Sequence, residues 1–280
     1  MREIDVERIT EAVAKLCWES NVNLGADIGL GLEKALRSEE SPVGRECLRG
    51  IIENANIARA EGLPICQDTG MVVVFIEYGQ EIIIRGGDFQ EAINEGVRRG
   101  YREGYLRNSV VVDPLRRVNS GDNCPAVIHT QIVPGDRLRI TVVPKGFGSE
   151  NQSRLAMLTP AQGREGVKKF IIDTVNLAGA CPCPPLVVGV GLGGTMEMAA
   201  LLAKKALLRE VGTNNPDPFW DEFEAELLRE INDLGIGPQG LGGSNTALAI
   251  HIIPYPTHIA GLPVAVNISC HVTRHQSAEL

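Results

Sequence analysis

The sequence predicts a mixed α+β fold. Helical and strand-like segments are interleaved along the 280 residues, but they lack the regular βαβ period of a doubly wound sheet. A hydrophobic content of 44% is sufficient for a large core, in one domain or in two lobes. We expect one domain over residues 1–280, and the stretch from Asn214 to Pro218 is the best candidate for a boundary between lobes.

Amphipathic periodicity defines the helices. In the first of them Ile9, Val13, Leu16 and Cys17 share one face, and Asp5 is placed to cap the first turn. The predicted helices are Asp5 to Asn21, Ile28 to Leu36, Val43 to Ala60, the residues from the capping Asp88 to about Tyr105, Val167 to Leu177, Thr195 to Glu210 and Phe219 to Leu234.

Short apolar runs define the strands. They are Met71 to Ile76, Glu81 to Arg85, Ala126 to Val133, Arg137 to Val143, Leu186 to Val190, Thr246 to Ile253 and Leu262 to Ser269. The turn at residues 78–80 allows the first two strands to pair, and residues 134–136 are expected to join the next two as a hairpin. The last ten residues read as a polar tail.

Composition excludes several classes of protein. A net charge of −8, few aromatic residues and no lysine-rich run argue against nucleic acid as a partner. The first residues lack the apolar core of a signal peptide, and no run approaches the ~18 apolar residues of a membrane span, so we expect a cytoplasmic location. An odd count of seven cysteines argues against a disulfide framework and favours thiolates that hold a metal.

Three cysteines stand outside the helical patterns. Cys66 lies in Pro64-Ile65-Cys66-Gln67-Asp68-Thr69-Gly70, Cys183 follows Cys181-Pro182, and Cys270 ends an apolar segment. By contrast, Cys17 and Cys47 fall on apolar helix faces, where they are expected to pack in a core. We hypothesise that Cys66, Cys183 and Cys270 meet at one inorganic cluster.

Two other site classes are weaker. Residues 189–194 match the glycine fingerprint of a dinucleotide site, but the acidic Glu210 ends a predicted helix rather than a second strand. These glycines instead predict a tight strand-to-helix turn, whose backbone N–H groups could hold an anion. A zinc site at Cys181 and Cys183 lacks the second compact pair that zinc ribbons use.

The sequence around each histidine, and around Arg107, indicates whether the residue is structural or a candidate for the site. His129 and His251 lie within apolar strand patterns and are expected to be structural, whereas His258 lies in a loop shortly before Cys270 and is favoured for chemistry. Arg107 follows a helix, where it either interacts with the helix end or forms a fork for a carboxylate.

Several motifs together resemble one enzyme family, the class I fumarases and L(+)-tartrate dehydratases, which are oxygen-sensitive iron–sulfur hydro-lyases. The motifs are Cys66-Gln67-Asp68-Thr69-Gly70, Lys145-Gly146-Phe147-Gly148-Ser149-Glu150-Asn151, Cys183-Pro184-Pro185 through Gly191, Gly235 to Gly243, and His258 to Pro263 leading to Ser269-Cys270-His271. They occur in the family's order over most of the chain.

The resemblance implies a [4Fe–4S] cluster held by Cys66, Cys183 and Cys270, with one iron left open. It selects Cys183 over Cys181, because the family cysteine immediately precedes Pro-Pro. It further implies that a dicarboxylate substrate is surrounded by Gln67, Asp68, Arg107, Gly148 and His258. In this scheme His258 gives a proton to the leaving oxygen and Asp68 sets its tautomer. Phe147 departs from the family, which often has glycine there.

The resemblance also implies a partner. Single-chain members carry a second domain with the catalytic base and further carboxylate-binding residues, and this sequence looks like the α subunit of a two-chain enzyme. We therefore expect a β subunit, in an α2β2-type heteromer, and reversible hydration of fumarate to L-malate. Dehydration of L(+)-tartrate is the alternative, and a non-catalytic module that senses or binds through the cluster is a second alternative.

Overall fold

The computed structural model describes all 280 residues, which form two compact units. The first unit contains Met1–Leu24, Ala55–Phe147 and Arg274–Leu280, and the second contains Gly25–Asn54 and Gly148–Thr273. Each unit combines helices with its own sheet, which confirms the α+β prediction. Asn214 to Pro218 lies inside the second unit, where the Asn215 amide donates to Glu224 Oε1 at 2.8 Å and to the Ile252 carbonyl at 3.3 Å.

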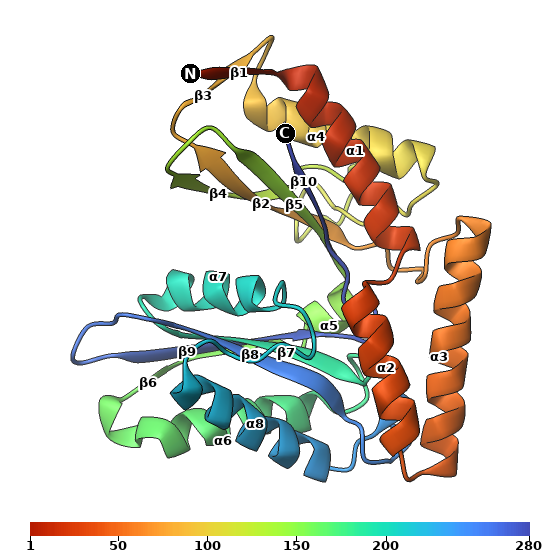
Figure 1. The fold of residues 1–280 in the computed structure, drawn as a ribbon, viewed down its shortest axis with the longest axis vertical. Helices are drawn as coiled ribbons and strands as arrows, with labels where there is room; N and C mark the ends of the chain where they lie inside the picture. Colours follow the sequence, from red (N-terminus) through yellow and green to blue (C-terminus); the bar gives the residue numbers. More distant parts are fainter. The chain divides into compact units, whose positions relative to one another are not determined.

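The first unit is built around a sheet of order β10-β5-β2-β4 (Figure 1). Its strands are β2 (Met71–Gly79), β4 (Val127–Val133), β5 (Leu138–Lys145) and β10 (Gln276–Glu279). Helices α1 (Val6–Val22) and α4 (Phe89–Glu103) pack together with this sheet in one core. The two helices approach closely because α4 has glycine at the contact: an added Cβ on Gly100 would lie 2.6 Å from the Ala14 carbonyl oxygen.

Strand pairing in this unit corrects three predictions. Strand β2 lies between β4 and β5, parallel to the first and antiparallel to the second, so β4 and β5 do not form a hairpin. Strand β3 (Ile82–Arg85) does not pair with β2 but lies parallel to β1 (Arg2–Asp5). The predicted tail contains β10, because Ala278 and Leu280 pack against the core.

The second unit contains a sheet of order β6-β9-β7-β8 with helices on both faces (Figure 1). The strands are β6 (Arg154–Leu158), β7 (Leu186–Gly193), β8 (Ala247–Tyr255) and β9 (Leu262–Ser269). Helix α7 (Met196–Ala206) covers one face, and α6 (Gly163–Ala178) and α8 (Pro218–Asp233) cover the other. Strand β6 was not predicted from the sequence.

The glycines of residues 189–194 have a packing role. Strand β7 continues through Gly193, so Gly189 and Gly191 lie in the strand and not in the predicted strand-to-helix turn. A Cβ on Gly189 would lie 2.1 Å from the Ala203 carbonyl oxygen of α7, and one on Gly191 would lie 2.0 Å from that of Ala199. Only glycine allows α7 to approach the strand this closely. The turn itself is confined to Gly193 and Gly194, whose φ angles are +94° and +69°.

The remaining elements are α2 (Ala26–Ser38), α3 (Pro42–Glu61), which runs from the second unit into the first, α5 (Phe147–Glu150), and the short helices η1 (Pro160–Gln162) and η2 (Pro238–Gly240). The predicted helices are all present, and Asp5 and Asp88 cap α1 and α4 as predicted. None of the helices combines the length and the continuous apolar character needed to cross a bilayer.

Candidate functional site

The first group of predicted site residues lies in the Cys66 loop, residues 65–70, which joins α3 to β2. Cys66 is half-buried and Gln67 is exposed. The Asp68 carboxylate accepts two backbone N–H bonds, from Gly70 to Oδ1 at 3.0 Å and from Phe147 to Oδ2 at 2.8 Å. Asp68 therefore closes its own loop and joins it to the segment that follows β5.

Buried side chains hold the carbonyl groups of this loop. Tyr101 Oη donates to the carbonyl oxygens of Thr69, at 2.6 Å, and Gly70, at 3.0 Å. Asn123 Nδ2 donates to the Gly70 carbonyl at 3.2 Å. These donors satisfy inward-facing carbonyl groups that would be costly to bury alone. The sequence offered no signal for either residue, because both act on backbone atoms far away in the chain.

Arg274 holds the same loop from the C-terminal segment. Its guanidinium Nη2 donates to the Asp68 carbonyl oxygen, and Nε donates to the Pro144 carbonyl oxygen at 3.3 Å. The side chain is buried, with the residue 5% exposed. Arg274 thus connects the Cys66 loop to the end of β5, and the sequence reading as a polar tail missed it.

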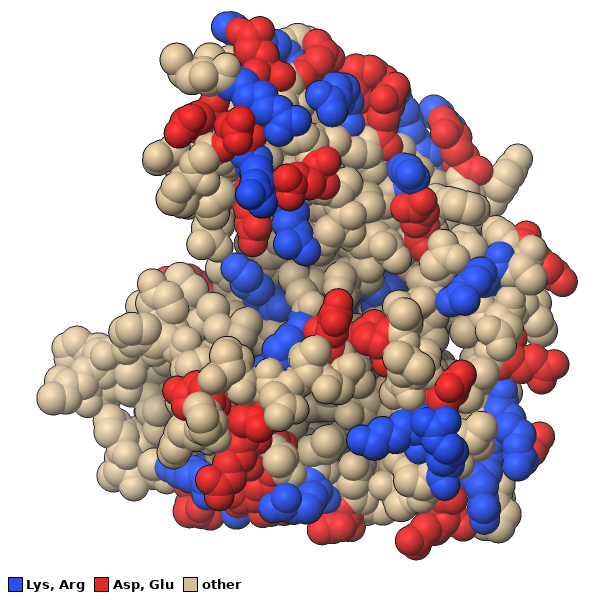
Figure 2. All heavy atoms as spheres, viewed as in Figure 1, with Lys and Arg blue, Asp and Glu red and all other residues tan.

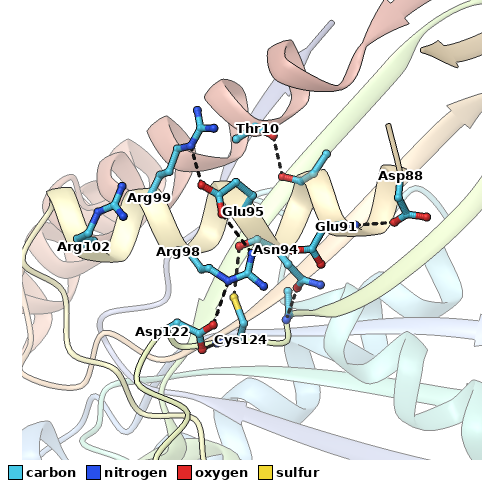
Figure 3. Close-up of polar contacts among 12 residues, drawn as sticks. Thr10, Asp88, Glu91, Asn94, Glu95, Arg98, Arg99, Arg102, Asp122 and Cys124 are labelled. Carbon is cyan, nitrogen blue, oxygen red and sulfur yellow. Dashed lines mark hydrogen bonds and ion pairs between the residues drawn. The ribbon is translucent and has the colours of Figure 1, made fainter. Parts of the chain in front are cut away.

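Polar contacts join α4 to Asp122 and Cys124, the residues on either side of Asn123 in the chain (Figure 3). Arg98 Nε donates to Asp122 Oδ2 at 3.0 Å, and Cys124 Sγ donates to the Asn94 carbonyl oxygen at 3.3 Å. Burial alone would raise the pKa of Asp122, but hydrogen bonds from the Cys124 backbone and from Arg98 lower it below its ordinary value. The carboxylate therefore remains charged and keeps the loop attached to the helix.

Arg107 follows α4 and is brought to the Cys66 loop through its backbone. The Thr69 hydroxyl accepts from the Arg107 N–H at 2.9 Å and donates to the Arg107 carbonyl at 3.1 Å. The side chain of Arg107 is exposed. Hydrogen bonds therefore connect the loop that carries Cys66, Gln67 and Asp68 to the segment that carries Arg107, within the first unit.

The second group of predicted residues lies in the second unit. The backbone N–H of His271, the residue after Cys270, donates to the Cys183 carbonyl oxygen at 3.4 Å, and its ring Nδ1 lies 2.9 Å from the same oxygen. The Gln239 amide nitrogen lies 3.2 Å from the same Nδ1. The Gln239 amide donates to the Pro184 carbonyl at 2.9 Å. The structure thus brings the Cys270 segment against Cys183.

Glycine-rich residues 235–243 pack against the turn that carries Cys183. An added Cβ on Gly240 would lie 2.2 Å from Ala180 Cβ, and Gly240 has a φ of +74°, so both space and backbone require glycine. Gly148 lies near the same turn, since its Cβ would be 3.9 Å from the Cys181 carbonyl oxygen. Cys183 itself has a φ of +55°, which is uncommon for a residue other than glycine and recurs at functional sites.

His258 lies apart from these cysteines. It is exposed in the loop between β8 and β9, where the Thr257 hydroxyl donates to the Gly194 carbonyl at 2.9 Å beyond the end of β7. Cys183 precedes β7 and Cys270 follows β9, which is antiparallel to β7, so both lie at the other end of the sheet. The seven residue steps from Val187 to Gly194 correspond to roughly 20 Å.

The His258 loop is also closed on itself. The Ala260 N–H donates to His258 Nδ1 at 3.2 Å, which places the proton of a neutral ring on Nε2. This contact comes from Ala260, a residue of the same loop, and the tautomer role expected for Asp68 stays a prediction. Figure 2 shows this loop, at the end of the second unit, as a projection without charged side chains.

Cys17, Cys124, His129 and His251 are structural. Burial raises the pKa of the Cys17 thiol far above its ordinary value, and burial followed by the charge of Asp122 raises that of Cys124 to about 11. Cys47 is only partly buried. His129 stacks on Phe75 with ring centroids 5.3 Å apart. His251 is buried, and desolvation followed by the charge of Arg209 lowers its pKa to about 4.

Thiols that are not buried in a core remain at Cys66 in the first unit and at Cys47, Cys181, Cys183 and Cys270 in the second. None of the seven cysteines forms a disulfide. Within neither unit do three or more His, Cys, Asp or Glu side chains gather in a metal-binding arrangement. The three predicted ligands are divided between the units, and their soft thiolate chemistry fits an iron–sulfur cluster.

Comparison with known proteins bears on these motifs. The sequence model of the family described as fumarate hydratase (Fumerase) matches residues 10–279. A protein of Methanocaldococcus jannaschii, provisionally named L(+)-tartrate dehydratase subunit alpha, is 42% identical over 95% of both chains. The L(+)-tartrate dehydratase subunits alpha of Escherichia coli and Shigella boydii are each 32% identical over 96% of this chain and 89% of their own.

Proposed function

The chain belongs to the fumarate hydratase family, and on this premise we propose that it is the α subunit of an iron–sulfur hydro-lyase acting on a small dicarboxylate. The observation that carries the proposal is the family match over residues 10–279, which spans all of the motifs that hold Cys66, Cys183 and Cys270. Two of the other cysteines, Cys17 and Cys124, are buried in the core, where a thiolate is disfavoured.

We propose Cys66, Cys183 and Cys270 as the ligands of a [4Fe–4S] cluster. When bound by three thiolates, such a cluster leaves one iron open to act as a Lewis acid toward a substrate hydroxyl. The contact between His271 and the Cys183 carbonyl supports Cys183 over Cys181, because it ties Cys183 directly to the Cys270 segment.

The protein side chains would bind and orient the substrate. Arg107 is exposed and its backbone is fixed by Thr69, so its guanidinium can form a two-point contact with a carboxylate. Gln67 is exposed on the Cys66 loop, and each Asp68 oxygen retains acceptor capacity beyond its single backbone bond. Gly148 presents backbone without a side chain. Orientation by such contacts can supply several kcal/mol of the barrier reduction.

His258 would give the Nε2 proton to the leaving oxygen as an imidazolium, once Nδ1 has taken up a proton and released the Ala260 N–H, and the ring would return to the neutral form. Its place at the opposite end of the sheet from Cys183 and Cys270 separates it from any cluster that these thiols hold. We therefore propose that His258 serves the site of a different chain in the assembly. Its exposure in an uncharged loop is compatible with insertion into a neighbouring subunit.

A β subunit is part of the proposal because the relatives are named as subunits alpha. In our proposal it supplies the base that removes the carbon-bound proton and further basic residues for the carboxylates, in an α2β2-type heteromer. Fumarate hydration is the first candidate reaction, from the sequence motifs. L(+)-tartrate dehydration is the second, since the relatives carry that name.

Co-purification under nitrogen with the products of neighbouring genes, followed by assays with fumarate, L-malate and L(+)-tartrate, tests the function. We expect a brown protein with absorbance at about 400 nm, from a thiolate-bound cluster, and hydro-lyase turnover only with the partner present. Full turnover by the chain alone would contradict the two-subunit proposal. A cluster-containing complex that turns over none of the three compounds would favour the non-catalytic sensing module.

A further inference from the structure

The buried guanidinium of Arg274 has an unusual set of contacts. Two of its nitrogens donate to neutral carbonyl groups, of Asp68 and of Pro144, and the third, Nη1, is buried without a hydrogen-bond partner. No carboxylate forms a salt bridge with it. A neutral amide could hold the two carbonyls, and a buried charge without a counter-ion is costly. The retained positive charge therefore requires a reason beyond the two hydrogen bonds.

The two segments that Arg274 connects are in tight contact at other points. An added Cβ on Gly70 would lie 2.7 Å from the Lys145 nitrogen, so only glycine fits, and the Phe147 N–H donates to Asp68. Arg274 thus reinforces a junction at which the Cys66 loop is fixed against the end of β5. The carbonyl groups of Asp68, Thr69 and Gly70 are held by these inward contacts, whereas Cys66 is half-buried and Gln67 is exposed.

The position of Arg274 in the sequence adds a second observation. It follows Cys270 by four residues, and it contacts the residue two positions after Cys66. One short segment therefore carries both a proposed cluster ligand and the side chain that fixes the loop of another proposed ligand. Arg274 was not among the candidate residues identified from the sequence.

We propose that Arg274 is a positioning residue for the cluster site: it fixes the Cys66 loop against the end of β5 and places a positive charge beside it. A cluster bound by three thiolates is anionic, so this charge stabilises the loaded state. The charge component rests on the function proposed above, whereas the loop component depends only on the contacts within the first unit.

The two components are separated by Arg274→Met, which removes donors and charge, and Arg274→Lys, which keeps the charge without the two-point contact. Arg139→Gln, at an exposed arginine of β5, is the matched control. The first measurement is amide hydrogen exchange at Gly70 and Phe147 in the chain without iron, because both amides donate to Asp68. The second is the iron content of the loaded complex and the rate at which a chelator removes it under nitrogen.

We expect exchange at these amides to rise roughly tenfold or more in both Arg274 variants, since each loses at least one charged hydrogen bond. Iron loss should be fastest in Arg274→Met and slower in Arg274→Lys. Exchange equal to that of Arg139→Gln would overturn the loop component. Equal iron loss in the methionine and lysine variants would overturn the charge component, as would general unfolding of both. A wild-type complex that never holds iron would refute the proposed function and the charge component, while the exchange result would still decide the loop component.

Discussion

The Thr69 hydroxyl bonds both backbone groups of Arg107, accepting from its N–H at 2.9 Å and donating to its carbonyl at 3.1 Å. The two residues are 38 positions apart in sequence. One side-chain oxygen therefore fixes the segment that presents the arginine to the loop that presents Cys66. This contact fixes the position of the Arg107 backbone, from which the guanidinium group extends.

Thr69→Val tests this contact, because valine has nearly the same shape without the hydroxyl. We expect a loss of about 1–3 kcal/mol in stability from the unpaired backbone groups and a rise in KM for the dicarboxylate. Urea unfolding and steady-state kinetics measure the two effects. Thr130→Val, at an exposed position of β4, is the control. An unchanged KM would show either that Arg107 does not bind the substrate or that Thr69 is not needed to position Arg107.

The choice between the neighbouring cysteines is tested by single substitutions. Cys183→Ser should abolish cluster assembly, whereas Cys181→Ser should spare it, because only Cys183 is bonded to the segment that carries Cys270. Iron and sulfide per chain after anaerobic reconstitution are the readout. The opposite outcome would reverse the ligand assignment.

His258 is tested by subunit complementation. If it serves another chain, a complex of His258→Asn chains is inactive, but mixing these with Cys183→Ser chains creates pairs in which one site is complete. Activity should then reappear after the two variants are unfolded, mixed and reassembled under nitrogen. The control mixes His258→Asn chains with chains that carry both His258→Asn and Cys183→Ser, since neither chain then offers the histidine. Absence of recovery in fully mixed assemblies would contradict action between chains.

His251 predicts a pH dependence of stability. Desolvation and Arg209 lower its pKa from 6.5 to about 4, so between these values the unfolded chain binds a proton that the folded chain does not. Above pH ~6.5 the ring is neutral in both states and has no effect on the free energy of unfolding. As the pH falls toward ~4, protonation of the unfolded chain lowers this free energy by on the order of 3 kcal/mol in all. His251→Asn should flatten the fall in melting temperature over this range.

Gly191 tests the contact between β7 and α7. Alanine there would place Cβ 2.0 Å from the Ala199 carbonyl oxygen, so the helix must shift, and we expect a loss of about 3 kcal/mol. Gly50→Ala in α3 meets nothing within 4 Å and should instead stabilise by about 0.5–1 kcal/mol. Urea unfolding compares the two. Equal effects would show that the close approach of α7 does not constrain the strand.

The candidate site residues that the sequence offers are those carried by local motifs. Cys66, Gln67 and Asp68 are adjacent in the chain, and the polar context of this motif after a helix is visible without a structure. The residues that support the motif were not visible. Tyr101, Asn123 and Arg274 donate to backbone carbonyls, and a carbonyl has no sequence signature that would identify its donor.

By itself the sequence determined the helices and their caps, the strand segments with apolar runs, the burial of Cys17 and the family to which the chain belongs. These features depend on periodicity, on hydrogen bonds a few residues long and on motifs read in order. Only the tertiary structure decided that β2 separates β4 from β5, that Arg274 holds the Cys66 loop, and that His258 lies at the far end of the sheet from Cys183. The physical reason is that strand partners and side-chain contacts to distant backbone are selected by packing between segments remote in the chain, which local sequence does not encode.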